Sequence, residues 1–350
     1  MDTTQPPPGA PPLPDRYTVV DRLAPGGTAT LWRAYDGDLG REVVVKVPTS
    51  QEPTDRAALA HEARMTRKAR GDGVPVVHDM DVQGPVPYFT MERVAGENLR
   101  ATRSDHAVEL PDRAAVLGIG IAKALQNVHF TDVVHRDIKP ENLIMRPDGR
   151  IGIVDFANAV VLGTSPDRDR FAGWTPGYTA PERFTQGSGT GTPQSDLYAV
   201  GVIMRDMLTG GRTFPPTESP RATAMRQVEG DVRPTAEVRP DLPRPLTALV
   251  DQLMRVDPRQ RPLHAGEVVS RLEGMLPDLR RAAEREVQSA RGRNLAARGL
   301  RRLGSLHDVA RSREASRDPA SGPRPSERGH RRDEPRERGT AREPHGFGPE

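Results

Sequence analysis

The stretch VVHRDIKPENLI, residues 133–144, decides how the rest of the chain is interpreted. It places Asp137, Lys139 and Asn142 on a tight loop that we expect between a helix and a strand. A carboxylate, an ammonium and an amide oxygen this close together suit a hydroxyl group, a charged phosphate and a metal ion. HRD alone is compatible with a surface charge cluster, but the KPEN that follows argues against that alternative.

A second acidic position follows thirteen residues after Asn142. Asp155 ends an apolar run in IGIVDFANAV, residues 151–160, after a turn at RPDG, residues 146–149. Its carboxylate supplies a second hard oxygen ligand of the kind that Mg²⁺ prefers. Ala157 follows where a glycine might be expected. If the backbone there is left-handed, alanine costs about 1 kcal/mol; at negative φ it stabilises by roughly 0.4–1 kcal/mol.

The sequence before this loop predicts a small β-rich region. Short runs of β-branched and aromatic residues, separated by Gly-containing turns, are typical of strands. We expect strands at 16–23, 28–36, 41–48, 74–82 and 86–94. The composition of 54–70 predicts one helix, with Thr54 as N-cap and Gly71 as its stop.

From residue 97 onward the pattern becomes helical. Within 112–130, Leu117, Ile121, Leu125 and Val128 repeat at helical spacing, which predicts a long helix with one buried face. Further helices are expected at 195–208, near 244–255 and near 265–276, with helical potential over 280–310. His78 and His129 show no partner pattern and are interpreted as packing residues.

Other motifs occur in a fixed order around the loop. They are Lys46 in VVVK, Glu62 in AHEAR sixteen residues later, WTPGYTAPE at 174–182, Asp196 in SDLYAVG and Arg261 in DPRQRP. With the loop itself, this set resembles the bacterial-type serine/threonine protein kinases over roughly residues 16–276. The resemblance implies an α+β fold of two lobes: a small β-rich N-lobe and a larger, mainly helical C-lobe.

The resemblance also implies the domain boundaries. The N-lobe is expected over 16–91, the hinge over 92–96 and the C-lobe over 97–276. A disordered Pro-rich leader would occupy 1–15, and an Arg-rich tail 277–350 would be partly helical and then disordered.

The site residues follow from the same resemblance. Asp137, Lys139, Lys46 and Glu62 are the expected catalytic group, and Asn142 and Asp155 the expected Mg²⁺ ligands, with Mn²⁺ as an alternative metal. The residues implied to surround ATP are Leu23, Ala24, Pro25, Gly26, Gly27, Thr28, Ala29, Thr30, Leu31, Val44, Lys46, Met91, Glu92, Val94, Asn142, Ile144 and Asp155.

Further residues receive supporting roles from the resemblance. His135 and Phe156 would tie the two loops to the core, and Asp196 would anchor the catalytic loop. Glu182 and Arg261 are expected to form a buried structural pair. Arg136 would receive a phosphate from the activation loop, where Thr164, Ser165 and Thr175 are the candidates.

The lysine count is an independent observation. Only four of the 51 basic residues are lysine, yet Lys46 and Lys139 are two of them. A compact ammonium group differs from a planar guanidinium at a phosphate. The retention of lysine favours a working phosphate site over a retired one.

The phosphate-covering loop departs from the family pattern. Ala24 and Ala29 replace two of its three glycines, and Val44 stands where an alanine usually contacts adenine. We therefore expect weaker ATP binding than is typical. A pseudokinase that acts as a nucleotide-binding or regulatory module is the alternative to an active enzyme.

Composition limits the remaining options. The chain has no cysteine and no run of about 20 apolar residues of the kind a membrane span needs, so we expect a cytoplasmic protein. Residues 281–350 carry 17 arginines against 11 acidic residues. An acidic partner for this tail is one hypothesis, and a solvated tail is the favoured alternative. Scattered aromatic residues argue against nucleic-acid binding by the domain itself. Expected partners are proteins with serine or threonine acceptors; the sequence does not indicate an oligomeric state.

Overall fold

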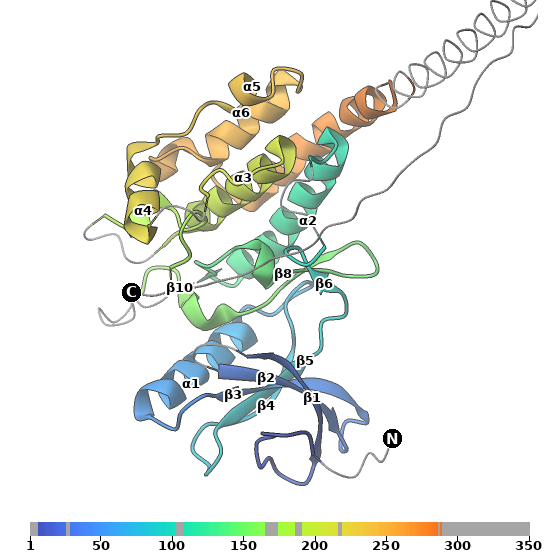
Figure 1. The fold of residues 1–350 in the computed structure, drawn as a ribbon, viewed down its shortest axis with the longest axis vertical. Coiled ribbons are helices and arrows are strands. Elements are labelled where there is room, and N and C mark those ends of the chain that lie inside the picture. The colour runs from blue at the N-terminus through green and yellow to red at the C-terminus, as the bar shows by residue number, and fades with distance from the viewer. Residues whose placement is uncertain are drawn as a thin grey trace, which may run out of the picture. The chain divides into compact units, whose positions relative to one another are not determined.

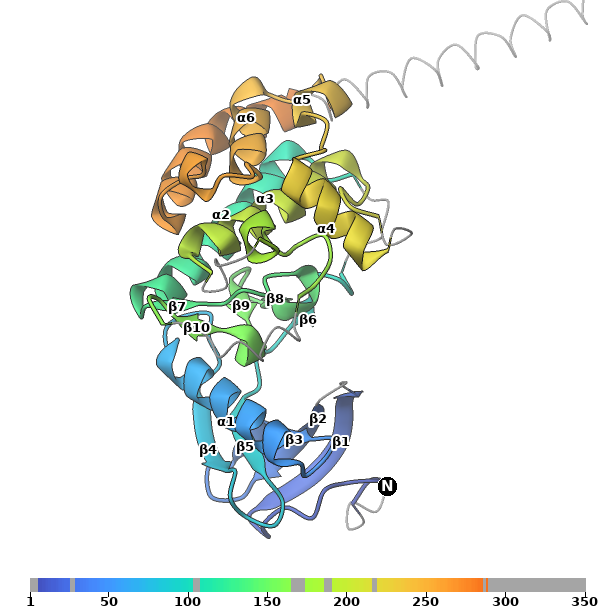
Figure 2. The same ribbon diagram turned by 90° about the vertical axis from the view of Figure 1, so that its left-hand side faces the viewer.

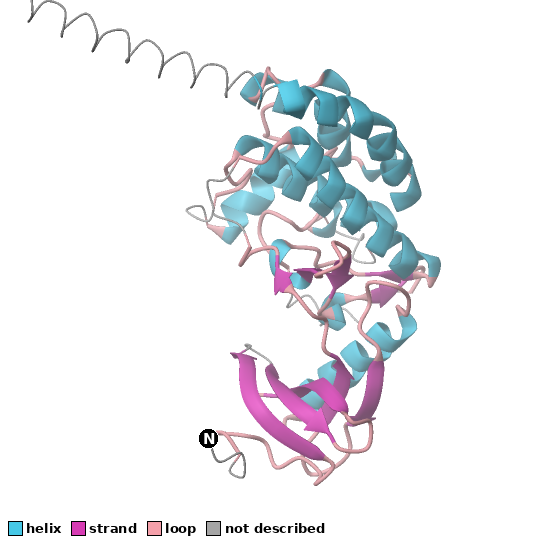
Figure 3. Cartoon of the chain, turned by 90° about the vertical axis from the view of Figure 1, so that its right-hand side faces the viewer, coloured by secondary structure: helices cyan, strands magenta, loops and turns pink. Residues whose placement is uncertain are grey.

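The computed structural model describes residues 6–25, 29–102, 108–164, 174–185, 191–215, 219–285 and 288. All of them belong to one compact unit. Strands gather in the N-terminal part of this unit and helices dominate the rest (Figure 3). The α+β fold with two lobes is confirmed. The tail beyond residue 288 lies outside the described residues.

The N-lobe is built on one antiparallel sheet. Its strands follow the order β1-β2-β3-β5-β4 (Figure 1). They are β1 Tyr17–Pro25, β2 Ala29–Asp36, β3 Arg41–Pro48, β4 Val77–Asp81 and β5 Tyr88–Glu92. Each lies within two or three residues of an expected strand, because alternating β-branched and aromatic residues encode these elements locally.

Helix α1, Pro53–Lys68, packs against this sheet. The expected N-cap was wrong: Glu52 occupies the cap position and Pro53 is the first helical residue. Proline suits that position because its fixed φ is already helical and its missing N–H would have no helical partner. The helix ends at Lys68 with Ala69 as its C-cap, two residues before Gly71. Leu59 and Ala63 bury one face of α1 against Val44 and Phe89 of the sheet.

The leader contributes to the other side of the sheet. From residue 6 it is described, and Ala10 and Leu13 pack against a cluster that includes Tyr17, Trp32 and Tyr88. The sequence predicts no order over 1–15. Apolar side chains within a proline-rich segment can dock at low entropic cost, because proline already restricts the unfolded chain.

The C-lobe core lies between long helices. They are α2 Pro111–Phe130, α3 Pro193–Thr209, α6 Arg244–Leu253 and a helix over residues 265–285, with the shorter α4 Pro220–Glu229 and α5 Thr235–Val238 (Figure 1). Leu117, Ile121, Leu125 and Val128 are all buried on α2, as predicted. Gly201 lets α3 approach α6 closely, since a Cβ there would meet Leu253 Cβ at 2.7 Å.

Short elements fix the loops that face the N-lobe. β8 Leu143–Met145 pairs with β9 Ile151–Ile153 and with β6 Glu97–Asn98, while β7 Val133–Val134 pairs with β10 Val160–Val161 (Figure 2). The 3₁₀ turns η1 Pro140–Asn142 and η2 Phe156–Asn158 lie in these loops, and η4 Pro181–Arg183 and η5 Pro258–Gln260 occur elsewhere in the C-lobe. None of the helices in the described part of the chain is both long and apolar enough for a membrane span.

Candidate active site

The loop after β7 is held by a buried carboxylate. Asp196 on α3 accepts hydrogen bonds from the backbone N–H groups of His135, at 2.9 Å, and Arg136, at 2.7 Å. A third contact comes from His129 on α2, whose Nε2 lies 2.8 Å from Asp196 Oδ2. Interpreting His129 as a packing residue was therefore wrong. These bonds hold Arg136 at a φ of 69°, a left-handed conformation that is costly without such support.

A ring contact joins this loop to the one after β9. The rings of His135 and Phe156 meet edge to face with centroids 4.7 Å apart. His135 Nε2 lies 3.1 Å from the carbonyl oxygen of Val154, and the Val154 N–H donates to the Asn142 carbonyl at 3.0 Å. The two loops are thus joined by backbone hydrogen bonds as well as by buried rings.

His78, which was also interpreted as a packing residue, has a polar neighbour in the N-lobe: its Nδ1 lies 3.3 Å from Arg41 Nη2.

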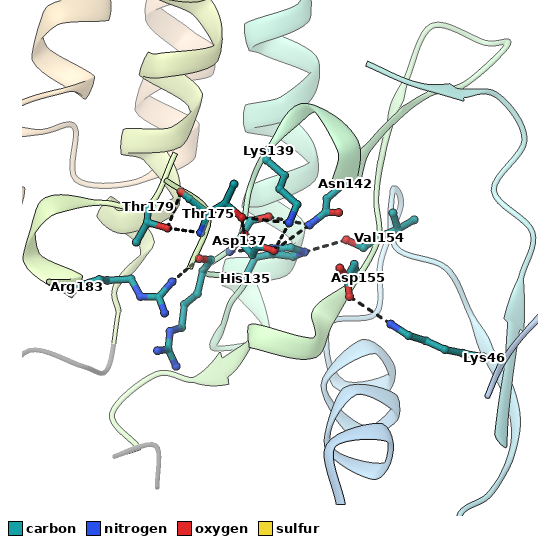
Figure 4. A network of polar contacts seen from close by, with 11 residues as sticks. Lys46, His135, Asp137, Lys139, Asn142, Val154, Asp155, Thr175, Thr179 and Arg183 are labelled. Atoms are coloured by element: carbon teal, nitrogen blue, oxygen red, sulfur yellow. Dashed lines mark hydrogen bonds and ion pairs between the residues drawn. The ribbon is translucent and has the colours of Figure 1, made fainter. Parts of the chain in front are cut away.

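Asp137 sits between an ammonium group and a hydroxyl group (Figure 4). Lys139 Nζ donates to its Oδ2 at 2.7 Å, and Thr175 Oγ1 donates to its Oδ1 at 2.7 Å. Lys139 also reaches Thr175 Oγ1 at 3.2 Å. A carboxylate has about four lone-pair sites, so these contacts leave capacity for another hydroxyl donor.

Asn142 and Asp155 offer oxygen atoms for a metal ion. The Asn142 amide nitrogen donates to the Asp137 carbonyl at 2.9 Å, which leaves the amide oxygen free of that bond. Asp155 has a φ of 68° and a side chain that is 38% exposed. Although burial opposes it, Lys46 lowers the pKa of Asp155 below its ordinary value. An amide oxygen and an ionised carboxylate fit a hard divalent cation.

An ion pair crosses from β3 to α1 beside this position. Lys46 Nζ lies 2.5 Å from Glu62 Oε1 and 3.3 Å from Asp155 Oδ1. Burial disfavours the ammonium, but the two carboxylates outweigh it and raise the pKa of Lys46 to about 12. Burial raises the pKa of Glu62 to about 7 against the effect of Lys46. The raised pKa of Lys46 favours its charged form, whereas the raised pKa of Glu62 favours its neutral form. Because Lys46 has a short contact to Glu62 and a second carboxylate in Asp155, we assign it as charged, with Glu62 readily protonated.

The expected nucleotide-binding residues lie on both lobes. Val44 and Met91 are buried and pair across β3 and β5. Leu23 is exposed, and Ala24 pairs with Leu31 across β1 and β2. Gly26, Gly27 and Thr28 lie outside the described residues. The other expected residues lie as follows: Ala29 is buried on β2, Thr30 and Glu92 are half-buried on β2 and β5, Val94 is half-buried after β5 and Ile144 is half-buried on β8.

Ala157 adopts a negative φ within η2, next to Asp155, which carries the positive φ. Its exposed side chain has no need of glycine's freedom. The sequence left open whether alanine is costly here, at a left-handed backbone, or stabilising, at negative φ. The observed negative φ means that Ala157 stabilises the fold relative to glycine.

Arg136 and Arg183 form a pair of cationic side chains at the loop that carries Asp137. Arg183 Nη1 donates to the Arg136 carbonyl at 2.5 Å, and the Nε atoms of both residues are buried with no hydrogen-bond partner in the described part of the chain. Burial and the charge of Arg183 lower the pKa of Arg136 to about 10. The sequence pointed to Arg136 but not to Arg183. Nearby, Glu182 and Arg261 form the expected pair, with oxygen–nitrogen distances of 2.8 and 2.7 Å.

Comparison with known proteins agrees with this geometry. Residues 17–270 match the family model described as "Protein kinase domain". The chain is 31% identical over 284 residues to a probable serine/threonine-protein kinase PknB of Corynebacterium glutamicum, covering 77% of this chain and 43% of the relative. It is 29% identical over 304 residues to the serine/threonine-protein kinase PknL of Mycobacterium tuberculosis, covering 84% and 75%.

A third bacterial relative, the serine/threonine-protein kinase PknA of Mycobacterium tuberculosis, is 30% identical over 265 residues, covering 71% of this chain and 58% of the relative. The chain thus spans less than half of the PknB relative and just over half of PknA. The region matched by the family model contains the loops that carry Asp137 and Asp155, the Lys46–Glu62 ion pair and Asp196. The chain therefore belongs to the protein kinase family, and the three relatives it resembles are bacterial serine/threonine-protein kinases.

Proposed function

We propose that this chain transfers the γ-phosphoryl group of ATP to serine or threonine residues of protein substrates. The observation that carries the proposal is the placement of Asp137 between Lys139 and Thr175, on a loop fixed by Asp196. Phosphoryl transfer depends mainly on positioning and charge, and this arrangement supplies both.

The residues divide the chemistry among them. Asp137 orients the acceptor hydroxyl and takes its proton, since an ionised carboxylate with a free lone pair is a suitable base. Lys139 offsets negative charge on the group in transfer. Lys46, positioned by Glu62, binds the α- and β-phosphates of ATP. The 2.5 Å contact between Lys46 and Glu62 supports this assignment.

Asn142 and Asp155 would hold the divalent cation, for which we propose Mg²⁺ with Mn²⁺ as a substitute. When bound, the cation neutralises phosphate charge. Because Ala24 and Ala29 each add a methyl group to the phosphate-covering loop, we expect weaker nucleotide binding than in relatives with glycine. Nucleotide affinity measured with Mg²⁺ present tests this; absence of binding at millimolar ATP would contradict it.

Phosphorylation of the activation segment is the proposed control. Arg136 and Arg183 would together receive the phosphate, because two buried guanidinium groups repel each other until an anion joins them. Thr164 is exposed and Ser165 follows it in the chain. Thr175 already donates to Asp137, so we assign it to acceptor positioning. Mapping autophosphorylated residues by mass spectrometry distinguishes the three.

The proposed kinase domain extends over 16–276, with residues 92–96 as the hinge between the lobes. Its use of ATP and protein acceptors suits the cytoplasm. The decisive experiment incubates the purified chain with labelled ATP and a protein acceptor, with Asp137→Asn as the control. We expect label on serine and threonine in the wild type and none in the variant. Binding of nucleotide without any transfer would instead support the pseudokinase alternative.

A further inference from the structure

Helix α4, Pro220–Glu229, is attached to the C-lobe in an unusual way. Its only two buried residues are Thr223 and Gln227, which lie one turn apart on the same face. Both are polar, and the hydrogen bonds that attach this buried face to the rest of the C-lobe come from Gln227. Burying an amide side chain costs free energy unless its hydrogen bonds are satisfied. The partners of Gln227 therefore determine what this helix holds in place.

Gln227 is 1% exposed, and its side-chain amide hydrogen-bonds to the backbone of the turn at residues 177–179. Gln227 Oε1 accepts from the Gly177 N–H at 3.2 Å. Its Nε2 donates to the carbonyl oxygens of Gly177, at 3.1 Å, and Thr179, at 2.8 Å, and lies 3.3 Å from the Tyr198 hydroxyl on α3. Since a backbone N–H can only donate and a carbonyl can only accept, these contacts fix the orientation of the amide.

The turn held by Gln227 is the one that carries Thr175. The N–H groups of Tyr178 and Thr179 donate to the Thr175 carbonyl, and Thr179 Oγ1 accepts from the Thr175 N–H at 3.0 Å. Thr175 Oγ1 then donates to Asp137 Oδ1 at 2.7 Å (Figure 4). A continuous set of hydrogen bonds thus runs from Gln227 on α4 to the carboxylate that faces the acceptor hydroxyl.

We propose that Gln227 is a positioning residue that clamps the 175–179 turn and thereby places the protein acceptor at Asp137. The inference rests on the proposed kinase activity and adds a specific requirement to it. Apart from the contact with the Tyr198 hydroxyl on α3, the hydrogen bonds of Gln227 go to this turn on the acceptor side of the site. Lys46, Glu62 and Asp155, on the nucleotide side, contact one another. Loss of the clamp weakens use of the protein acceptor and leaves nucleotide binding intact.

The test compares Gln227→Met with Gln227→Glu. Methionine fills the same volume without a donor or acceptor. Glutamate keeps the acceptor for the Gly177 N–H but faces the two carbonyl oxygens with another oxygen. Gln252→Met is the matched control, since Gln252 also makes two hydrogen bonds in the C-lobe, to the Gln260 carbonyl and Arg271, away from the turn. Steady-state kinetics with varied acceptor and varied ATP are combined with direct nucleotide binding.

For both Gln227 variants we expect kcat/KM for the protein acceptor to fall by roughly tenfold or more, because small misplacement of a reacting group has large kinetic effects. Nucleotide affinity should stay within about twofold of the wild type. The Gln252 variant should match the wild type in both. An equal loss of nucleotide binding, or unchanged acceptor kinetics, would overturn the proposal.

Hydrogen exchange gives a readout that does not depend on catalysis. The amides of residues 177–179 should exchange faster in both Gln227 variants than in the Gln252 variant, since local opening follows the loss of local bonds. If the wild type transfers no phosphate at all, the proposed function fails, yet faster exchange still supports the clamp. Unchanged exchange at the turn would refute the clamp itself.

Discussion

Two buried carboxylates, one in each lobe, have pKa values that are shifted in opposite directions. Asp196 is 1% exposed and Glu62 is 4% exposed. Burial alone would raise the pKa of both, because it disfavours the charged form. The pKa of Glu62 is indeed raised, to about 7, whereas that of Asp196 is lowered.

The number of donors explains the difference. Asp196 accepts from His129 and from two backbone N–H groups, which together favour its anion over the effect of burial. Glu62 has the single close donor Lys46, which it shares with Asp155. One carboxylate is therefore a fixed anchor and the other can change its charge near neutral pH. The C-lobe loop is held permanently, whereas the N-lobe ion pair can be made and broken.

Removing the anchor should have the largest effect. Asp196→Asn places an amide N–H against groups that already donate, and breaking a buried charge network typically costs about 3–5 kcal/mol. We expect a loss of this size in the free energy of unfolding and a large loss of phosphoryl transfer, measured by denaturant titration and kinetics. Asp251→Asn is the matched control, because Asp251 also accepts from a backbone N–H and a hydroxyl, those of Thr235. If both variants lost equal activity, Asp196 would have no special role at the loop.

Glu62→Gln should separate activity from stability. The amide has the same shape, and the carboxylate it replaces is already disfavoured in the fold. We therefore expect the free energy of unfolding to change by less than about 1 kcal/mol, while kcat/KM for ATP falls roughly ten- to a hundredfold as Lys46 loses its positioning partner. Asp55→Asn on α1 is a control with no contact to Lys46. A stability loss equal to that of Asp196→Asn would remove the proposed contrast.

The pH profile sharpens the same contrast. Because the folded-state pKa of Glu62 is raised from 4.5 to about 7, protonation favours the fold. Its contribution to stability is complete below pH 4.5 and is lost as the pH rises through about 7. The ion pair with Lys46 has the opposite dependence, so kcat/KM for ATP should fall below about pH 7. This acid limb should be absent in Glu62→Gln, and a limb of equal size in the variant would contradict the assignment.

The sequence predicted those parts of the fold that depend on local periodicity. Helix α2 follows from the helical spacing of residues such as Leu117 and Ile121. The five strands follow from short runs of β-branched and aromatic residues between turns. Helix α4 was missed because its two buried residues are polar, so no apolar periodicity marks it. The cap of α1 was misplaced because both Thr54 and Pro53 are initiation signals, and the proline took the first helical position.

The contacts of the site could be predicted from the sequence only where the contacting residues lie within one motif. Asp137 and Lys139 lie within one short stretch, so their contact could be expected from sequence. His129 and Asp196 are 67 positions apart, and no spacing rule joins a helix end to an anchor that distant. Gln227 likewise bonds to residues about fifty positions away. Contacts set by helix packing are visible only in the folded chain.

The smallest effect is expected at Ala157. Its turn η2 packs against α1, the helix that carries Glu62, so the flexibility of this turn bears on the ion pair. With φ negative, Ala157→Gly should lower the free energy of unfolding by roughly 0.4–1 kcal/mol, since glycine gains freedom in the unfolded chain. Amide exchange over 155–159 should quicken, and activity should fall slightly as Glu62 is held less firmly. Ala58→Gly, at an exposed position on α1, should cost a similar amount without changing that exchange. If Ala157→Gly left both activity and loop exchange unchanged, the stiffening role of Ala157 would be refuted, and Lys46 alone would account for how Glu62 is held.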